Sequence, residues 1–159
     1  MRSNKQKGFS LIELLIVVAI ILIIAAIAIP NLLRSKMAAN EASAVASLRT
    51  YNTAIVAYQT TYATDPSTAF TQLGPVASGA PSASAADLVD SLLGAAAPVK
   101  SGYAFTYTPV AATPVTQYTI LAVPSSTSTG QRKFFTDQSG VIRQTTDGTT
   151  PTVTSTPIG

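Results

Sequence analysis

The chain has 159 residues, enough for one small domain carried on an extended segment, and only 11% of them are charged. It contains no cysteine and no histidine, which excludes disulfides and thiol chemistry and leaves only carboxylates to ligate a metal. We therefore expect no metal, no cofactor and no enzymatic activity, since the commonest general base is also missing. Arg2, Lys5 and Lys7 account for the whole formal charge of +3, so a nucleic-acid-binding surface is not expected either.

Composition divides the chain into four regions. Residues 1–8 are polar and basic, and residues 9–29 are apolar apart from two side chains. Residues 30–63 are mixed in polarity, rich in alanine and free of glycine. Residues 64–159 hold eight of the nine glycines and nine of the ten prolines, and they are rich in serine and threonine. This pattern predicts a long helical segment followed by a loop-rich globular head.

The apolar region has the length of a membrane span. Its 21 residues rise about 30 Å as an α-helix, which matches the hydrocarbon core of a bilayer. Three basic residues precede it, whereas Arg34 and Lys36 follow it, and this small excess favours a cytoplasmic N-terminus. We therefore expect residues 9–29 to cross a lipid bilayer and the rest of the chain to lie on the far side.

A helical pattern continues beyond Pro30. Apolar residues recur there at intervals of three, four and seven, while polar residues including Glu41 and Ser47 fall largely on other faces. Such spacing predicts an amphipathic helix over residues 31–63, which joins the apolar region in one helix of about 55 residues. Proline at position 30 predicts a kink, because its ring removes one main-chain hydrogen bond. The residues expected on the apolar face are Leu33, Met37, Val45, Leu48, Tyr51, Ile55, Tyr58 and Tyr62.

The glycine- and proline-rich remainder predicts a small α+β head. Leucines at helical spacing indicate a short helix within residues 83–95. Segments rich in β-forming residues and bounded by turn residues predict an antiparallel sheet of about four strands, packed on the second half of the long helix. DQSG at residues 137–140 is typical of a tight hairpin turn, and the chain from Thr145 onward is expected to be irregular. The predicted strands are residues 103–109, 117–123, 132–137 and 140–144.

Glu13 is an acidic residue within the apolar region, and three interpretations compete for this N-terminus. The first is a secretory signal peptide cleaved after AIA at residues 26–28, and the second is a plain signal anchor. In either case the carboxylate only adds a cost, about 2.5–3.5 kcal/mol on insertion scales. In the third interpretation the chain is cut after Gly8, and the new amine of Phe9 pairs with Glu13 of a neighbouring subunit. A polar pair of this kind fixes the axial register in a bundle of similar apolar helices.

The stretch KGFSLIELLIVVAIILIIAAIAIPN resembles the N-terminus of type IV prepilins. The resemblance implies a pilin-like roll whose leader, residues 1–8, is removed by a prepilin peptidase that cuts between Gly8 and Phe9. It also implies that this enzyme methylates the Phe9 nitrogen and that Glu13 neutralises the amine of an adjacent subunit during assembly. Pro30 is the position near which the helix is implied to bend.

A second stretch, GQRKFFTDQSGVIRQTTDG at residues 130–148, resembles the final β-region of some bacterial pilins. The pair of cysteines that usually brackets the C-terminal segment in that family is missing here. Strand pairing and packing are therefore expected to fasten residues 130–159.

Five charged residues in this second stretch admit a functional or a structural interpretation. Arg132, Lys133 and Arg143 form a small basic patch, for which a solvated strand edge is favoured over a ligand site. Asp137 and Asp147 lie in glycine-bearing turns similar to calcium loops of some secretion pseudopilins. Because carboxylates are few there, a turn role is favoured.

Together these observations predict a type IV pilin-like structural subunit that is processed, held in a bacterial inner membrane with its head in the periplasm, and then polymerised into a surface pilus. Its expected partners are identical subunits, the prepilin peptidase and methylase, an inner-membrane assembly platform and the lipid bilayer. A pseudopilin of a type II secretion system is the alternative within the family. A signal-anchored extracytoplasmic binding module is the alternative from another class.

Overall fold

The computed structural model describes three stretches of the chain, residues 8–63, 69–110 and 117–158. The chain forms two compact units, Met1–Ser35 and Lys36–Gly159. The first unit holds the apolar half of a long helix, and the second holds the amphipathic half of that helix together with one antiparallel sheet. The predicted α+β class, a long N-terminal helix packed against a small sheet, is therefore confirmed.

The long helix, α1, runs without interruption from Leu11 to Tyr62 over 52 residues, which confirms that its apolar and amphipathic parts form one element. It ends where Ala63 adopts a left-handed conformation with φ of 59°, a common way to stop a helix. Pro30 lies inside α1, and the bend expected there stays a prediction.

The apolar half of α1 exposes its side chains within the first unit. The exposed fraction of its large apolar side chains runs from 45% at Val18 to 75% at Leu11, and the most apolar window of the helix has no buried residue. In the part of the chain that the structure describes, one helix is long and apolar enough to cross a membrane. So large an apolar surface requires either lipid or other protein chains to cover it.

The amphipathic half of α1 supplies the helical side of the core. Its buried residues recur at intervals of three and four, as the sequence pattern predicts. The expectation that Glu41 and Ser47 lie on an outer face is wrong. Both can be buried because both are hydrogen bonded: the hydroxyl of Ser47 donates to the carbonyl of Ser43 at 2.9 Å, and Glu41 binds the head as described below. The buried set is Glu41, Ala44, Ser47, Leu48, Tyr51, Ala54, Ile55 and Tyr58.

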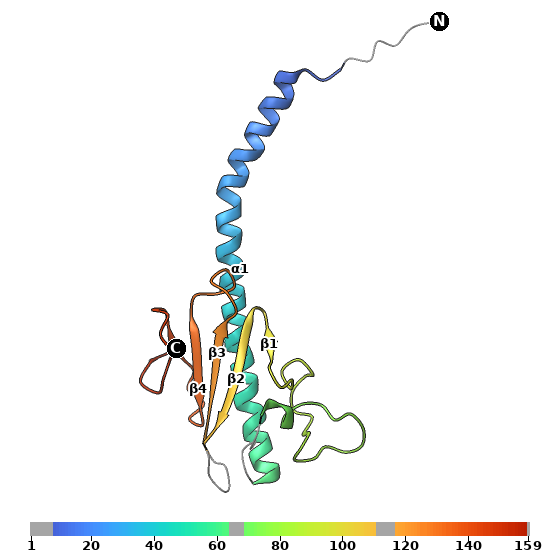
Figure 1. Ribbon diagram of the computed structural model, residues 1–159, viewed down its shortest axis with the longest axis vertical. Helices are drawn as coiled ribbons and strands as arrows, with labels where there is room; N and C mark the ends of the chain where they lie inside the picture. Colours follow the sequence, from blue (N-terminus) through green and yellow to red (C-terminus); the bar gives the residue numbers. More distant parts are fainter. Residues whose placement is uncertain (1–7, 64–68, 111–116, 159) are drawn as a thin grey trace, which may run out of the picture. The chain divides into compact units, whose positions relative to one another are not determined.

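The sheet has six strands in the order β1-β2-β3-β4-β5-β6, each antiparallel to the next, so the chain forms a simple meander. Figure 1 shows β1 to β4 side by side, alongside the part of α1 that belongs to the second unit. The number expected, about four, is too low, because two strands of two residues each carry no readable alternation. The tail expected to be irregular thus contributes an edge strand. The strands are β1 (Val99–Lys100), β2 (Tyr103–Pro109), β3 (Tyr118–Pro124), β4 (Lys133–Asp137), β5 (Arg143–Thr145) and β6 (Thr156–Pro157).

The core lies between α1 and the sheet. β2 and β3 pair along their full length, from Tyr103 opposite Pro124 to Pro109 opposite Tyr118, and this register places alternate side chains on the helix side. The predicted hairpin turn between β4 and β5 is confirmed, with the amide of Gly140 donating to the carbonyl of Asp137 at 2.9 Å. The buried residues that the sheet and its turns contribute include Tyr103, Phe105, Tyr118, Ile120, Ala122, Phe134 and Ile142.

The segment between α1 and β1 contains a 3-10 helix, η1 (Phe70–Gln72), and otherwise irregular backbone. The prediction of a short helix within residues 83–95 is wrong. A single helical turn forms there, closed by a hydrogen bond from the Gly94 amide to the Asp90 carbonyl at 2.8 Å. The backbone before this turn forms hydrogen bonds to the end of η1 and not within a helix of its own, because the amides of Leu88 and Val89 both donate to the carbonyl of Leu73. Tertiary hydrogen bonds have here replaced helical ones.

A close contact between Gly74 and Gly94 joins these two parts of the segment. A Cβ atom on Gly94 would lie 2.4 Å from the Cα atom of Gly74, well inside van der Waals contact. We expect Gly94→Ala to lower the free energy of unfolding by about 1–3 kcal/mol, since backbone must move to admit the methyl group. Urea unfolding followed by tyrosine near-ultraviolet circular dichroism measures this, and Ala96→Ser, at an exposed neighbouring position, should leave the midpoint unchanged.

Candidate functional site

The N-terminal end of α1 carries the residues that the sequence singles out for processing and assembly. Phe9 is 89% exposed, and Gly8 and Glu13 are exposed as well. The main-chain N–H of Ser10, just before the helix, donates to Oε2 of Glu13 at 2.8 Å. The spacing S-x-x-E of Ser10 and Glu13 is that of a capping box, a sequence signal for this bond that the charge of Glu13 alone does not reveal.

Glu13 has a favourable position for a negative charge, because it lies in the first turn, where main-chain N–H groups point out of the helix. Among the described residues, ion pairs join Lys100 to Asp90 and Arg132 to Glu41, and none involves Glu13. The carboxylate therefore meets no cation in the described part of the chain. The roles expected for Gly8, Phe9, Glu13 and Pro30 stay predictions.

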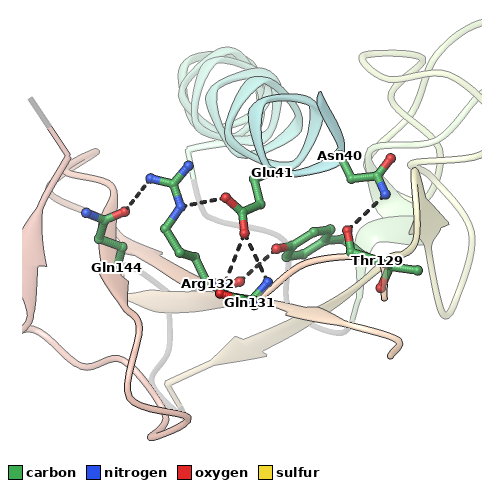
Figure 2. A network of polar contacts seen from close by, with 7 residues as sticks. Asn40, Glu41, Thr129, Gln131, Arg132 and Gln144 are labelled. Atoms are coloured by element: carbon green, nitrogen blue, oxygen red, sulfur yellow. Dashed lines mark hydrogen bonds and ion pairs between the residues drawn. The ribbon is translucent and has the colours of Figure 1, made fainter. Parts of the chain in front are cut away.

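A second polar cluster lies in the head, around Glu41 of α1. Figure 2 shows its carboxylate directed at the turn that leads into β4. Oε1 accepts the main-chain N–H groups of Gln131 at 3.0 Å and Arg132 at 3.2 Å, and Oε2 accepts Nε of Arg132 at 2.7 Å. The side chain of Glu41 is only 10% exposed and its oxygens are hydrogen bonded, whereas the side chain of Arg132 is 37% exposed. The ion pair is therefore buried on the carboxylate side and partly open to solvent on the guanidinium side.

Further contacts hold the partners of Glu41 in place (Figure 2). Nη1 of Arg132 donates to the side-chain carbonyl of Gln144 at 2.9 Å, and the hydroxyl of Tyr103 donates to the carbonyl of Arg132 at 2.8 Å. One residue earlier on α1, the amide of Asn40 donates to the carbonyl of Thr129 at 2.9 Å. The cluster thus joins α1 to β2, to the turn before β4 and to β5.

The charge of Glu41 is favoured in the folded chain. Burial raises the pKa of this carboxyl, but the hydrogen bonds from Gln131 and Arg132 and the charge of the Arg132 guanidinium outweigh it. The pKa of Glu41 is therefore lowered below its ordinary value of 4.5. The contact stabilises the fold at neutral pH and is lost on acidification.

These contacts explain how the C-terminal region is fastened without a disulfide. The predicted strand pairing is present, since β4 pairs with β5 and β5 with β6. The sequence did not indicate that α1 also binds this region through polar side chains. In addition to Glu41, the amide group of Asn52 donates to the Thr136 hydroxyl at 3.1 Å and to the Gly140 carbonyl at 3.2 Å.

The basic patch expected along a solvated strand edge does not exist in that form. Arg132 pairs with Glu41, Nζ of Lys133 donates to the carbonyl of Gly148, and Nη1 of Arg143 donates to the carbonyl of Ser155 at 3.1 Å. Each of the three cations therefore binds another segment of the second unit: Arg132 binds α1, Lys133 binds the segment after β5, and Arg143 binds the segment before β6.

Asp137 and Asp147 each accept hydrogen bonds within their own turns. Oδ1 of Asp137 accepts the amide of Ser139 at 2.9 Å, and Oδ1 of Asp147 accepts the amide of Thr149 at 3.0 Å. In the described stretches, no group of three or more acidic, histidine or cysteine side chains is gathered as a metal site would need. These bonds are those of the turn role that the sequence favours.

Comparison with known proteins bears on the N-terminal segment. The family described as "Prokaryotic N-terminal methylation motif" matches residues 3–29. The type IV wide pilus major component PilA4 of Thermus thermophilus is 56% identical over 45 residues, which are 28% of this chain and 34% of that protein. No solved structure matches the chain. The similarity to PilA4 spans about a third of the length of that protein. The methylation motif and the pilin relative show that the N-terminal segment of this chain is similar to that of type IV pilins and prepilins.

Proposed function

We propose that this chain is a structural subunit of a type IV pilus, held in a membrane by the apolar half of α1 and then polymerised through it. The observation that carries the proposal is the methylation motif at residues 3–29, which includes most of the apolar half of α1, where no residue is buried and one carboxylate lies in the first turn. A plain membrane anchor has no use for that carboxylate.

The proposed mechanism is an exchange of one apolar environment for another. In the membrane the exposed side chains of α1 are covered by lipid, and in the filament by the same helices of neighbouring copies. Assembly then never transfers this apolar surface into water, so no free energy is spent on exposing it. For the same reason the hydrophobic effect supplies little net driving force for assembly. Specific polar contacts must accordingly set the register of the helices.

The specific contact proposed is between Glu13 of one subunit and the amine of the next. A prepilin peptidase hydrolyses the amide bond between Gly8 and Phe9, which frees the Phe9 nitrogen as an amine. A methyl donor bound by the enzyme then transfers one methyl group to this nitrogen, which loses a proton. The remaining partners we propose are an inner-membrane assembly platform and the bilayer, with the N-terminus cytoplasmic and the head periplasmic. The excess of basic residues before the apolar region supports this orientation.

Intact-mass analysis of filaments sheared from the cell surface tests the proposal. We expect a subunit that begins at Phe9 and carries one added methyl group. A chain that begins at Met1 contradicts processing, and one that begins at Ile29 indicates a secretory signal peptide. If the chain is found only in membranes or in short periplasmic filaments that accompany protein secretion, a signal-anchored module or a pseudopilin replaces the pilus subunit.

A further inference from the structure

The two oxygen atoms of Glu13 have different surroundings. Oε2 accepts the main-chain N–H of Ser10 at 2.8 Å, whereas Oε1 accepts no hydrogen bond from a described residue. No described cation pairs with this carboxylate. One oxygen is thus tethered to the chain, and the other is open to a donor from outside.

The tether restricts a side chain that is otherwise free to rotate. Glutamate loses substantial conformational entropy when it is fixed in one rotamer, and a contact that fixes it beforehand lowers the entropy lost on binding. The donor here is a main-chain group at position 10, which stays with the chain when it is cut after Gly8. The tether therefore persists in the processed subunit.

We propose that Ser10 is a positioning residue for assembly. Its N–H holds Oε2 of Glu13 against the first turn of α1, and Oε1 is thereby presented to the Phe9 amine of a second copy. This inference rests on the proposed function, in which that amine and Glu13 meet. It adds that the carboxylate is oriented within the single subunit before the copies meet.

Substitution of Ser10 by proline removes the donor, since proline has no N–H, and proline is tolerated at the start of a helix. For Ser10→Pro we expect about three- to tenfold fewer filaments per processed subunit, because the carboxylate is no longer preorganised. Ser10→Ala keeps the N–H and is expected to assemble like the wild type. Counting per processed subunit, by intact mass, separates assembly from any effect on cleavage.

Nuclear magnetic resonance of the processed chain in detergent micelles supplies the readout that a structural role alone does not move. The Ser10 amide proton should resonate downfield in the wild type, where it donates a hydrogen bond to Glu13, and should move upfield in Glu13→Ala, which lacks the acceptor. The Leu14 amide, which donates to the Ser10 carbonyl at 3.3 Å, should stay protected from exchange in Ser10→Pro if the first turn is intact.

The outcomes are distinguishable. The inference is supported if Ser10→Pro loses filaments while its Leu14 amide stays protected, and if the Ser10 amide proton moves upfield in Glu13→Ala. The inference is overturned if Ser10→Pro assembles normally or if its first turn is frayed. It is also overturned if the Ser10 amide proton has the same resonance in wild type and Glu13→Ala. If Glu13→Ala itself assembles normally, the proposed pairing with the amine is wrong, whereas a defect in Glu13→Ala beside a normal Ser10→Pro overturns the inference alone.

Discussion

Replacing Glu41 by alanine is expected to lower the free energy of unfolding of the head by about 3 kcal/mol. The substitution removes the acceptor of two main-chain N–H groups and the partner of the Arg132 guanidinium, and it leaves these donors in a partly buried site. Urea unfolding of the full chain in detergent measures the change. All six tyrosines lie after residue 50, so their near-ultraviolet circular dichroism reports the second unit, Lys36–Gly159, alone.

Glu41→Gln is the matched control, because it keeps a carbonyl oxygen for the two amides and removes the charge. We expect this variant to lose about half as much stability as Glu41→Ala. In the wild type the contribution of Glu41 is fully present above its unfolded pKa of 4.5 and is lost as pH falls through the lowered pKa of the folded state. The loss of stability on acidification should therefore be shallower in both variants. Equal stability of Glu41→Ala and wild type at neutral pH contradicts the assignment.

Replacing Glu13 by alanine is expected to reduce surface filaments by at least about tenfold, because an unpaired amine left in an apolar bundle costs about 3–5 kcal/mol. Electron microscopy of sheared material, with immunoblots of the membrane fraction, measures filaments against the pool of subunits. The variant should remain in the membrane, since removal of a charge favours insertion.

Two comparisons sharpen this experiment. Glu13→Gln can still accept the Ser10 N–H but carries no charge, so we expect it to fail in assembly as Glu13→Ala does. Ala39→Ser, an exposed substitution elsewhere on α1, should assemble normally. Undiminished filaments in both Glu13 variants contradict the role of the carboxylate and favour an anchored module, for which Glu13 is dispensable.

Local patterns in the sequence predicted the regular elements well. β2 begins and ends at the predicted residues, because alternating aromatic and threonine side chains are bounded there by turn residues. The apolar spacing of Leu48, Tyr51, Ile55 and Tyr58 likewise places them on one buried face of α1. Both signals depend on neighbours within a few residues.

The errors arise where distant residues decide. The polarity of Glu41 predicts an exposed position. Its spacing of three residues from Ala44 and seven from Leu48 instead places it on the buried face of α1. The residues that bind its carboxylate lie about ninety positions later in the chain. Leu88 and Leu92 suggested a helix but remain partly exposed, because the backbone there bonds to Leu73. The N-terminal site could be predicted because its motif is continuous in the sequence. The contacts that fasten the C-terminal region could not, because they join residues far apart in the sequence.

The distance in sequence between Glu41 and its partners also sets an order of events during synthesis. Glu41 leaves the ribosome 91 residues before Arg132, and the strands follow one another in the order in which they pair. Strands β1 to β3 can therefore join as they emerge, while the carboxylate of α1 stays hydrated and its buried site stays open. The head becomes native only when the last part of the chain arrives, so a nascent subunit truncated before Gln131 cannot complete its core.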